Sequence, residues 1–308
     1  MITGFLGSGK TTFIKKYARY LMEQGENIGI LENDFGAVNV DMMLLQDVMG
    51  HQCELEMVAG GCDYDCHKRR FKTKLISMGM CGYDRVLVEP SGIYDVDEFF
   101  DVLHEEPLDR WYEIGNVIAI VDASLEPVMS EQAEYLLASQ ISRAGQVVLS
   151  RSENVTTKKI QETIQHLNQA LKQFQCKRTI SDNVFYKDWE QIEETDFAKI
   201  SSSGYTDDFM TKLRFEQSDV FDSLYFMNTA LPEEQLLDAV KDIFVDKSCG
   251  DVFRVKGFLR GKENPWMELN ATQKEIALRP IPQGQEVLIV IGEHLVEDRI
   301  NAHLEKKE

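Results

Sequence analysis

The sequence contains no long apolar segment. No apolar run among its 308 residues reaches the roughly 20 residues that a membrane-spanning helix needs. Its first residues also lack the basic region and the apolar region of a secretion signal. We therefore expect a cytoplasmic protein with no membrane partner, in which the 43% of apolar residues form an ordinary globular core.

The chain has fewer basic than acidic residues. The chain has 33 Lys and Arg against 52 Asp and Glu, a formal net charge of -19. Charge of this sign repels phosphate backbones and anionic lipids, so we expect no nucleic-acid partner. Residues 67–74 are a basic exception, which we interpret as the solvated face of a helix; contact with a phosphate or an acidic partner is the alternative.

Cysteine is scarce too. Six cysteines spread over the chain do not form a disulfide framework, so a close pair is a candidate for metal binding or redox chemistry. The isolated cysteines are predicted to be core residues: Cys53, Cys81, Cys176 and Cys249. The C-terminal histidines, His294 and His303, are predicted to lie on the surface.

Apolar β-branched runs alternate with amphipathic helical stretches in the first half of the chain. This pattern predicts an α/β fold with a mostly parallel, doubly wound sheet. The expected strands are 27–31, 85–89, 117–122 and 146–150, with helices after residue 9 and over 156–174. A polar, acidic stretch predicts a linker over 190–209, which divides a domain over 1–189 from a smaller α+β domain over 210–308. The second domain is expected to contain strands at 224–227, 252–259, 266–269, 275–278 and 286–291, and helices at 232–244 and 296–304.

Residues 4–11 fit the P-loop pattern G-x-x-x-x-G-K-[ST] without a mismatch. In this pattern, glycines let backbone N–H groups surround the β-phosphate, Lys10 reaches the β- and γ-phosphates, and the Thr11 hydroxyl ligates Mg2+. Only three residues precede Gly4, so either the preceding strand is very short or the native start lies upstream. The predicted nucleotide-binding residues of this segment are Gly4, Gly7, Ser8, Gly9, Lys10, Thr11 and Thr12.

A second motif ends the strand predicted over 85–89. The sequence Glu89-Pro90-Ser91-Gly92 places a carboxylate and a glycine at the carboxyl edge of the sheet, where α/β proteins bind ligands. Glu89 is predicted to hold an Mg2+-bound or attacking water, and the Gly92 N–H to contact the γ-phosphate.

A loop for base recognition is expected after the strand over 146–150. GTPases carry N/T/S-K-x-D at this place, with the carboxylate accepting hydrogen bonds from guanine, and this chain has Ser150-Arg151-Ser152-Glu153. Ser150, Arg151 and Glu153 are therefore predicted to bind the base, with the Arg151 stem lying along it. This favours GTP, with ATP or relaxed base choice as the alternative.

The order of these motifs resembles the CobW-type GTPases, relatives of the urease and hydrogenase nickel-insertion GTPases. The P-loop, Glu32-Asn33-Asp34-Phe35-Gly36 and the Glu89 motif carry the resemblance in the first half, and 253–259 and 288–292 carry it in the second. The resemblance implies a GTP-hydrolysing metallochaperone or metal-insertion factor for Zn2+ or Co2+. It also implies that Asp34, or less directly Asp41, lies near Mg2+ or the transported metal, which adds Asp34 to the catalytic candidates Lys10 and Glu89.

The metal motif departs from that family. Members usually carry G-C-x-C-C, whereas this chain has Gly61-Cys62-Asp63-Tyr64-Asp65-Cys66-His67. Cys62 and Cys66 can still close on one ion, with His67, Asp34, Asp63 or Asp65 completing the shell. The alternative is a pair of thiols that no longer bind metal.

The working hypothesis is a switch in which GTP and Mg2+ control metal binding and release to a client metalloprotein or metal-dependent enzyme. Its rival is a metal-independent GTP switch that binds a client through the C-terminal domain. A P-loop kinase is disfavoured, because no arginine cluster typical of a lid is evident and the 150–153 loop would have no role in it. The sequence does not indicate the client or the oligomeric state.

Overall fold

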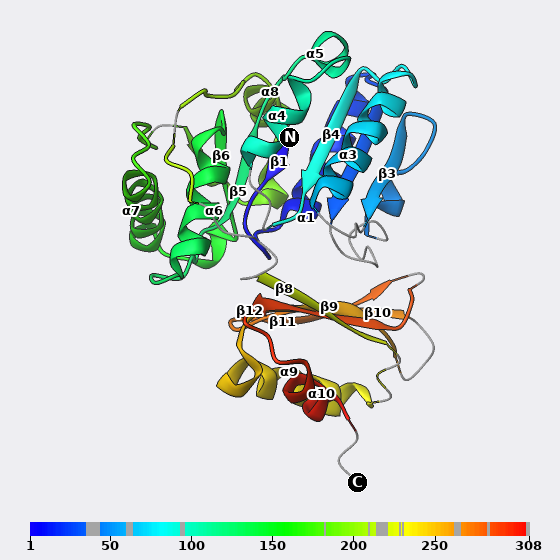
Figure 1. Cartoon of the computed structure of the whole chain (residues 1–308), viewed down its shortest axis with the longest axis vertical. Helices are drawn as coiled ribbons and strands as arrows, with labels where there is room; N and C mark the ends of the chain where they lie inside the picture. The colour runs from blue at the N-terminus through cyan, green and yellow to red at the C-terminus, as the bar shows by residue number, and fades with distance from the viewer. Residues whose placement is uncertain are drawn as a thin grey trace. The chain divides into compact units, whose positions relative to one another are not determined.

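The computed structural model describes residues 1–34, 44–59, 64–92, 96–181, 183–208, 210–213, 221–227, 229, 231–261, 266–281 and 284–305. The chain divides into two compact units, Met1–Leu213 and Arg214–Glu308 (Figure 1). Among the described residues, no helix has the length and apolarity to cross a membrane.

Parallel strands form the sheet of the first unit. They pair in the orders β3-β2-β4 and β1-β5-β6-β7, and β1 also contacts β4, which brings the two groups together. The bounds are β1 Ile2–Thr3, β2 Ile28–Asp34, β3 Cys53–Ala59, β4 Arg85–Pro90, β5 Ile118–Asp122, β6 Gln146–Ser150 and β7 Val184–Phe185. These seven strands pair with one another in parallel, as the sequence predicts, and β1 has two residues.

Helices cover this sheet (Figure 1). They are α1 Lys10–Glu23, α3 Tyr64–Gly79, α4 Val96–Leu103, α5 Leu108–Trp111, α6 Glu131–Ser142, α7 Thr157–Gln173 and α8 Glu194–Ser201, with short 3-10 turns η1 Gln46–Val48, η2 Ser152–Asn154 and η3 Trp189–Gln191. The apolar stripe of α1 packs into the main core, where Phe13 and Tyr17 contact Phe197 of α8. Burial of that stripe holds the helix that begins at the P-loop.

The segment predicted to be a linker, 190–209, belongs to the first unit. It contains the end of η3 and all of α8, whose Phe197 and Ile200 are buried against α1. A capping box between Glu193 and Asp196 starts the helix. The polar residues of this segment lie on the exposed face of α8, whereas its apolar residues join the core. The two units divide after Leu213.

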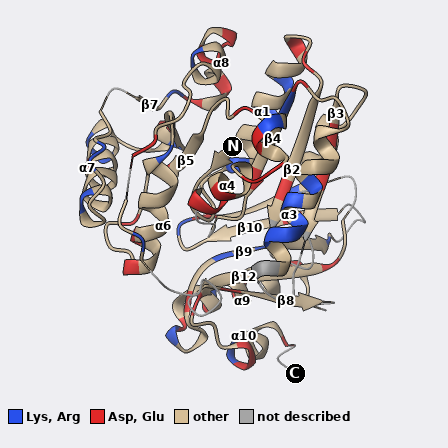
Figure 2. Ribbon diagram, turned by 45° about the horizontal axis from the view of Figure 1, so that its top comes forward, with Lys and Arg blue, Asp and Glu red and all other residues tan. Residues whose placement is uncertain are grey.

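The basic island of 67–74 lies on α3 (Figure 2). Lys68 and Lys72 pair with Glu105 at 3.1 and 2.7 Å, and Lys74 pairs with Glu56 at 2.8 Å. Hydrogen bonds from Lys72 and Lys68 lower the pKa of Glu105 below its ordinary value. These lysines are engaged by acidic groups of the same unit.

The second unit is a five-stranded antiparallel sheet with two helices on one face (Figure 1). The strand order is β11-β10-β9-β12-β8. The elements are β8 Phe221–Met227, α9 Glu233–Val245, η5 Lys247–Cys249, β9 Asp251–Arg260, β10 Trp266–Thr272, β11 Ile276–Ile281, β12 Val287–Glu293 and α10 Glu297–Leu304. Its core joins Val240 and Ile243 of α9, Ile300 of α10, and Val255 and Val290 of the sheet.

Two predicted placements of isolated residues are corrected here. Cys81 is exposed in the turn that follows α3, whereas Cys53, Cys176 and Cys249 are buried as predicted. His303 is partly buried rather than on the surface, because its ring pairs with Asp246 at 2.9 Å. His294 is exposed as predicted.

Candidate functional site

The P-loop connects β1 to α1 in a conformation that requires glycine. Gly4 has φ 149° and Gly9 has φ 100°, values that residues with a Cβ rarely adopt. A Cβ on Gly4 would lie 2.1 Å from the Ile120 carbonyl oxygen of β5, which leaves no room for a side chain. The loop therefore lies tightly against the carboxyl edge of the sheet.

Two polar side chains of the P-loop, those of Ser8 and Lys10, are buried. Lys10 is 8% exposed, and its Nζ donates a hydrogen bond of 3.1 Å to the Gly4 carbonyl. The Ser8 Oγ is buried and has no hydrogen-bond partner among the described residues. A buried ammonium and a buried hydroxyl fit a phosphate, which would accept hydrogen bonds from both. Thr12, in the first turn of α1, is exposed.

Glu89 lies beside the residue predicted to ligate Mg2+. The Thr11 hydroxyl donates to Glu89 Oε1 at 3.2 Å. Glu32 stands next to Glu89 in the β2–β4 register, and both carboxyl groups are buried, with 3% and 4% exposure. A hydroxyl and two carboxylates are hard oxygen donors of the kind that Mg2+ prefers, so this edge fits the ion and its waters.

Gly92 lies directly against the P-loop. A Cβ on Gly92 would be 2.8 Å from the Leu6 backbone nitrogen, so only glycine allows this approach. The Gln140 side chain of α6 donates to the Gly92 carbonyl at 2.9 Å and holds this peptide. The glycine of the Glu-Pro-Ser-Gly motif is thus fixed next to the predicted phosphate site.

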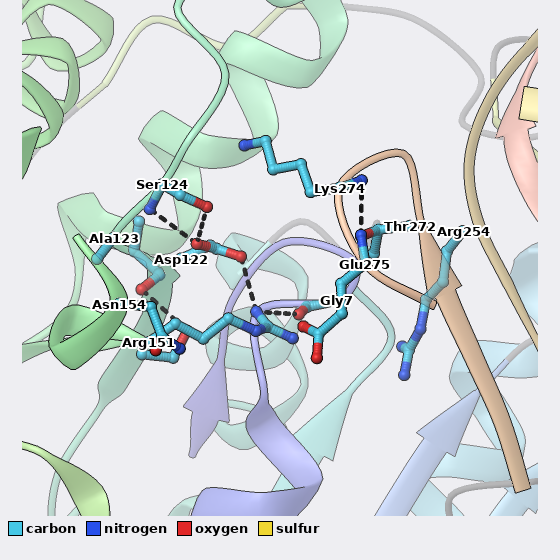
Figure 3. A network of polar contacts seen from close by, with 12 residues as sticks. Gly7, Asp122, Ala123, Ser124, Arg151, Asn154, Arg254, Thr272, Lys274 and Glu275 are labelled. Atoms are coloured by element: carbon cyan, nitrogen blue, oxygen red, sulfur yellow. Dashed lines mark hydrogen bonds and ion pairs between the residues drawn. The ribbon is translucent and has the colours of Figure 1, made fainter. Parts of the chain in front are cut away.

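Arg151 joins the predicted base loop to the P-loop (Figure 3). Its Nη1 donates to the Gly7 carbonyl at 3.1 Å and to Asp122 Oδ2 at 2.7 Å. The other oxygen of Asp122 accepts from the Ser124 N–H and hydroxyl, at 2.8 and 2.6 Å. Arg151 also has a positive φ of 54°, an uncommon conformation for a residue with a side chain.

The remaining base-loop residues lie at the end of β6. Ser150 is buried and its Oγ donates weakly to the Val121 carbonyl at 3.4 Å. Glu153 is exposed and accepts a hydrogen bond from Asn154. The Ser152 hydroxyl donates to the Tyr186 carbonyl, which ties the loop to the segment after β7. The roles of Ser150 and Glu153 in binding a base remain predictions.

Part of the predicted metal motif lies on α3. Cys66 is partly buried and is not in a disulfide, and the adjacent His67 is 2% exposed with Nε2 2.8 Å from Asn33 Oδ1 of β2. An amide oxygen only accepts, so Nε2 carries the proton and Nδ1 is the nitrogen with a lone pair in the neutral ring. Cys62, Asp41, Asp63 and the side chains of Asp34 and Asp65 lie outside the described residues.

Four residues of this region were not predicted as site residues: Glu32, Asn33, Asp122 and Gln140. Asp122 ends a buried strand at the same sheet edge as Glu89, so the rule that selects Glu89 also selects Asp122. Gln140 belongs to a helix distant in sequence, and no local pattern indicates its contact with Gly92.

A P-loop at the carboxyl edge of a parallel sheet defines the first unit as a nucleotide-binding domain. Residues 1–181 match the family described as CobW/HypB/UreG, nucleotide-binding domain, and residues 223–308 match the Cobalamin synthesis protein cobW C-terminal domain. The chain belongs to the CobW family.

Two curated relatives come from Escherichia coli (strain K12). The chain is 28% identical over 180 residues to "Zinc chaperone YjiA", covering 54% of each chain. It is 29% identical over 157 residues to "Zinc chaperone YeiR", covering 51% of this chain and 47% of the relative. The alignments span about half the length of these relatives.

Solved structures resemble the chain more distantly. The Zn(II)-bound YjiA GTPase from E. coli is 18% identical, with 99% of this chain and 98% of that chain covered and a TM-score of 0.36. The signal recognition particle receptor FtsY from Elizabethkingia anophelis is 15% identical, with 65% and 63% covered and a TM-score of 0.41. Likenesses of this size carry no functional argument.

The contact between Arg151 and the P-loop leads to a first prediction. Arg151→Ala removes hydrogen bonds from a charged donor to Gly7 and Asp122, each worth about 1.5–3 kcal/mol at most, and its partly exposed position reduces the loss. We expect about tenfold weaker binding of GTP, GDP and ATP alike, measured by titration of fluorescent nucleotides. Arg151→Lys, which keeps the positive charge and the donors of an ammonium group, should lose less. A loss confined to guanine nucleotides would instead assign Arg151 to the base.

Proposed function

We propose that this protein is a GTP-hydrolysing metallochaperone that binds GTP with Mg2+ and delivers Zn2+ to a client metalloprotein. The P-loop, Glu89 and the Ser150–Glu153 loop support nucleotide binding and hydrolysis. Zinc is favoured over cobalt because both curated relatives are named zinc chaperones. The residues proposed to hold the transported ion are Cys62, Cys66, His67 and Asp34.

One observation supports the coupling between nucleotide and metal: Asn33 makes hydrogen bonds both to the proposed metal site and to the Glu-Pro-Ser-Gly segment beside the nucleotide site. Its side-chain oxygen contacts His67, the neighbour of Cys66, at 2.8 Å. Its main-chain oxygen accepts a hydrogen bond from the Ser91 N–H at 2.8 Å, directly before Gly92. A displacement of the Glu-Pro-Ser-Gly segment on loss of the γ-phosphate therefore acts on the residue that orients His67.

The donor set suits zinc. Thiolate and imidazole are the ligands that Zn2+ takes most often, usually four in a tetrahedron, whereas Mg2+ and Ca2+ take oxygen. In zinc sites the ring nitrogen that does not bind the metal usually donates to an oxygen, and Nε2 of His67 faces such an oxygen on Asn33. His67 therefore has the hydrogen bond that orients a zinc ligand.

The coupling is tested by measuring Zn2+ affinity against a chromophoric chelator, with GDP or with a non-hydrolysable GTP analogue and Mg2+. Couplings between two sites are typically worth about 1–3 kcal/mol, or 5–150-fold. We expect wild-type Zn2+ affinity to differ at least about fivefold between the two nucleotide states. The double variant Cys62→Ser, Cys66→Ser should lose this difference and keep its nucleotide affinity.

Cys81→Ser is the matched control, because Cys81 is an exposed thiol just after the same helix. It should behave as the wild type does. Equal zinc affinity in both nucleotide states of the wild type would refute the coupling and favour a metal-independent switch that binds a client protein.

A further inference from the structure

The second unit contains a cluster of three metal-ligating side chains that the proposed function does not use. A carboxylate oxygen of Asp246, the Sγ of Cys249 and a ring nitrogen of His303 all lie within 4.8 Å of one another. The residues come from the end of α9, from η5 and from α10, which pack side by side (Figure 1). The fold thus brings together an oxygen, a sulfur and a nitrogen donor.

We propose that Asp246, Cys249 and His303 form an exchangeable Zn2+ site in the C-terminal unit. The mixed donor set suits a borderline-soft divalent ion and is unlike the all-oxygen shells of Mg2+ and Ca2+. Three protein ligands leave one position of a tetrahedron for water or for an incoming ligand, which distinguishes open sites from closed structural ones. This inference does not rest on the proposed function of the nucleotide unit.

The spacing of the donors fits such an ion after a small adjustment. Zinc lies about 2.0–2.3 Å from its ligands, so the corners of its tetrahedron are roughly 3.3–3.7 Å apart. His303 Nε2 and Asp246 Oδ2 are 2.9 Å apart, and all three donors lie within 4.8 Å. Shifts of about 1 Å or less therefore produce the required separations.

The backbone around the cluster is held firmly. The Ser248 N–H donates to Asp246 Oδ1 at 2.9 Å, which orients the carboxylate, and the Cys249 N–H donates to the Asp246 carbonyl at 2.9 Å. The next residue, Gly250, has φ 97°, and a Cβ there would lie 2.5 Å from the His294 carbonyl oxygen. Two of the three donors thus belong to one tight turn.

The exposure and charge of the three side chains are consistent with a Zn2+ ion that exchanges with solvent. Cys249 is fully buried, while the side chains of Asp246 and His303 are 38% and 21% exposed, so an ion would have the thiolate beneath it and one open side. Binding replaces three waters of the hydrated ion by three metal–ligand bonds. The Cys249 thiol gives its proton to solvent, and the proton on Nε2 of the neutral His303 ring moves to Nδ1, which breaks the hydrogen bond to Asp246. The negative charges of the thiolate and the carboxylate then balance the two positive charges of the ion. Because the occupied site is neutral, the nearby Arg299 cation does not oppose binding.

Without a metal, the same contacts have a purely structural interpretation. The pair between His303 and Asp246 would join α10 to α9, and Cys249 would fill the core. The two interpretations differ in one observable, since only a metal site forms a metal–sulfur bond.

The experiment uses the full chain with Cys62→Ser and Cys66→Ser, so that the two thiols of the proposed zinc site in the nucleotide unit cannot contribute. Titration with Co2+, the spectroscopic substitute for Zn2+, should show one ion per chain with a cobalt–thiolate charge-transfer band that Zn2+ abolishes. Adding Cys249→Ala should remove the band. Adding His303→Gln or Asp246→Asn, which keep the size of the side chain, should weaken binding at least about tenfold.

Control variants are Cys176→Ala, a buried thiol of the first unit, and His294→Gln, an exposed histidine of the second. Both should keep the band and the affinity. If Cys249→Ala does not fold, His303→Gln and Asp246→Asn decide. A band that is absent in the starting protein, or unchanged in these two variants, would overturn the site whatever the outcome for Cys62 and Cys66.

Discussion

Replacing Lys10 by alanine is expected to weaken GTP binding by roughly 100-fold or more and to remove measurable hydrolysis. Lys10 is buried at the start of α1, and its ammonium donates a hydrogen bond to the Gly4 carbonyl. Hydrogen bonds from a charged donor to two phosphates, at about 1.5–3 kcal/mol each, account for a loss of that size. Isothermal titration with GTP and a phosphate-release assay measure the two effects.

Lys16→Ala is the matched control. Lys16 lies on the same helix, but its side chain is 25% exposed and pairs with Glu190, which is 83% exposed. Ion pairs of this kind are worth about 0–1 kcal/mol, so binding and hydrolysis should stay near wild-type values. Wild-type GTP affinity in Lys10→Ala would show that this P-loop does not hold the phosphates.

Glu89→Gln should separate hydrolysis from binding. The amide keeps an oxygen that accepts from the Thr11 hydroxyl, but it removes the negative charge beside the predicted Mg2+ and its water. Losing one group that stabilises a transition state typically costs about 100–1000-fold in kcat. We expect a loss of that size in single-turnover GTP hydrolysis, with GTP affinity within a few-fold of the wild type.

Glu56→Gln provides the comparison for that variant. Glu56 is also a strand glutamate of the same sheet, but it pairs with Lys74 at its surface and should tolerate the change. Parallel losses of affinity and kcat in Glu89→Gln would assign Glu89 to holding the P-loop instead of to the chemistry.

Local patterns predicted most of the elements around the site. Val147, Val148 and Leu149 are fully buried in a strand whose bounds match the prediction, because parallel strands with helices on both faces need continuous apolar runs. The strand Cys53–Ala59 was not predicted, since its glutamates interrupt the apolar run. It lies at the edge of the sheet beside β2, where alternation replaces a continuous run.

The site was less predictable where a contact joins distant segments. The stem of Arg151 is predicted to lie along the base, and no motif indicates that its guanidinium contacts Asp122 and the Gly7 carbonyl, 29 and 144 residues away in sequence. The same holds for Asp246 and His303, which are 57 residues apart. No local periodicity contains such pairs, because they depend on which faces of helices and which strand ends the fold brings together.

The double attachment of Asn33 limits how much of any coupling between nucleotide and metal this one residue can carry. The described link consists of one hydrogen bond on each side of a single residue. Bonds of this kind contribute about 0.5–1.5 kcal/mol each, so this link can change metal affinity by about tenfold, or roughly 100-fold at most. A metal carrier whose affinity changes by this factor would retain its ion in the nucleotide state with the higher affinity. In the other nucleotide state it would release the ion to a client whose metal affinity is only slightly higher than its own. Direction of transfer would then be decided by the recipient's affinity as much as by hydrolysis.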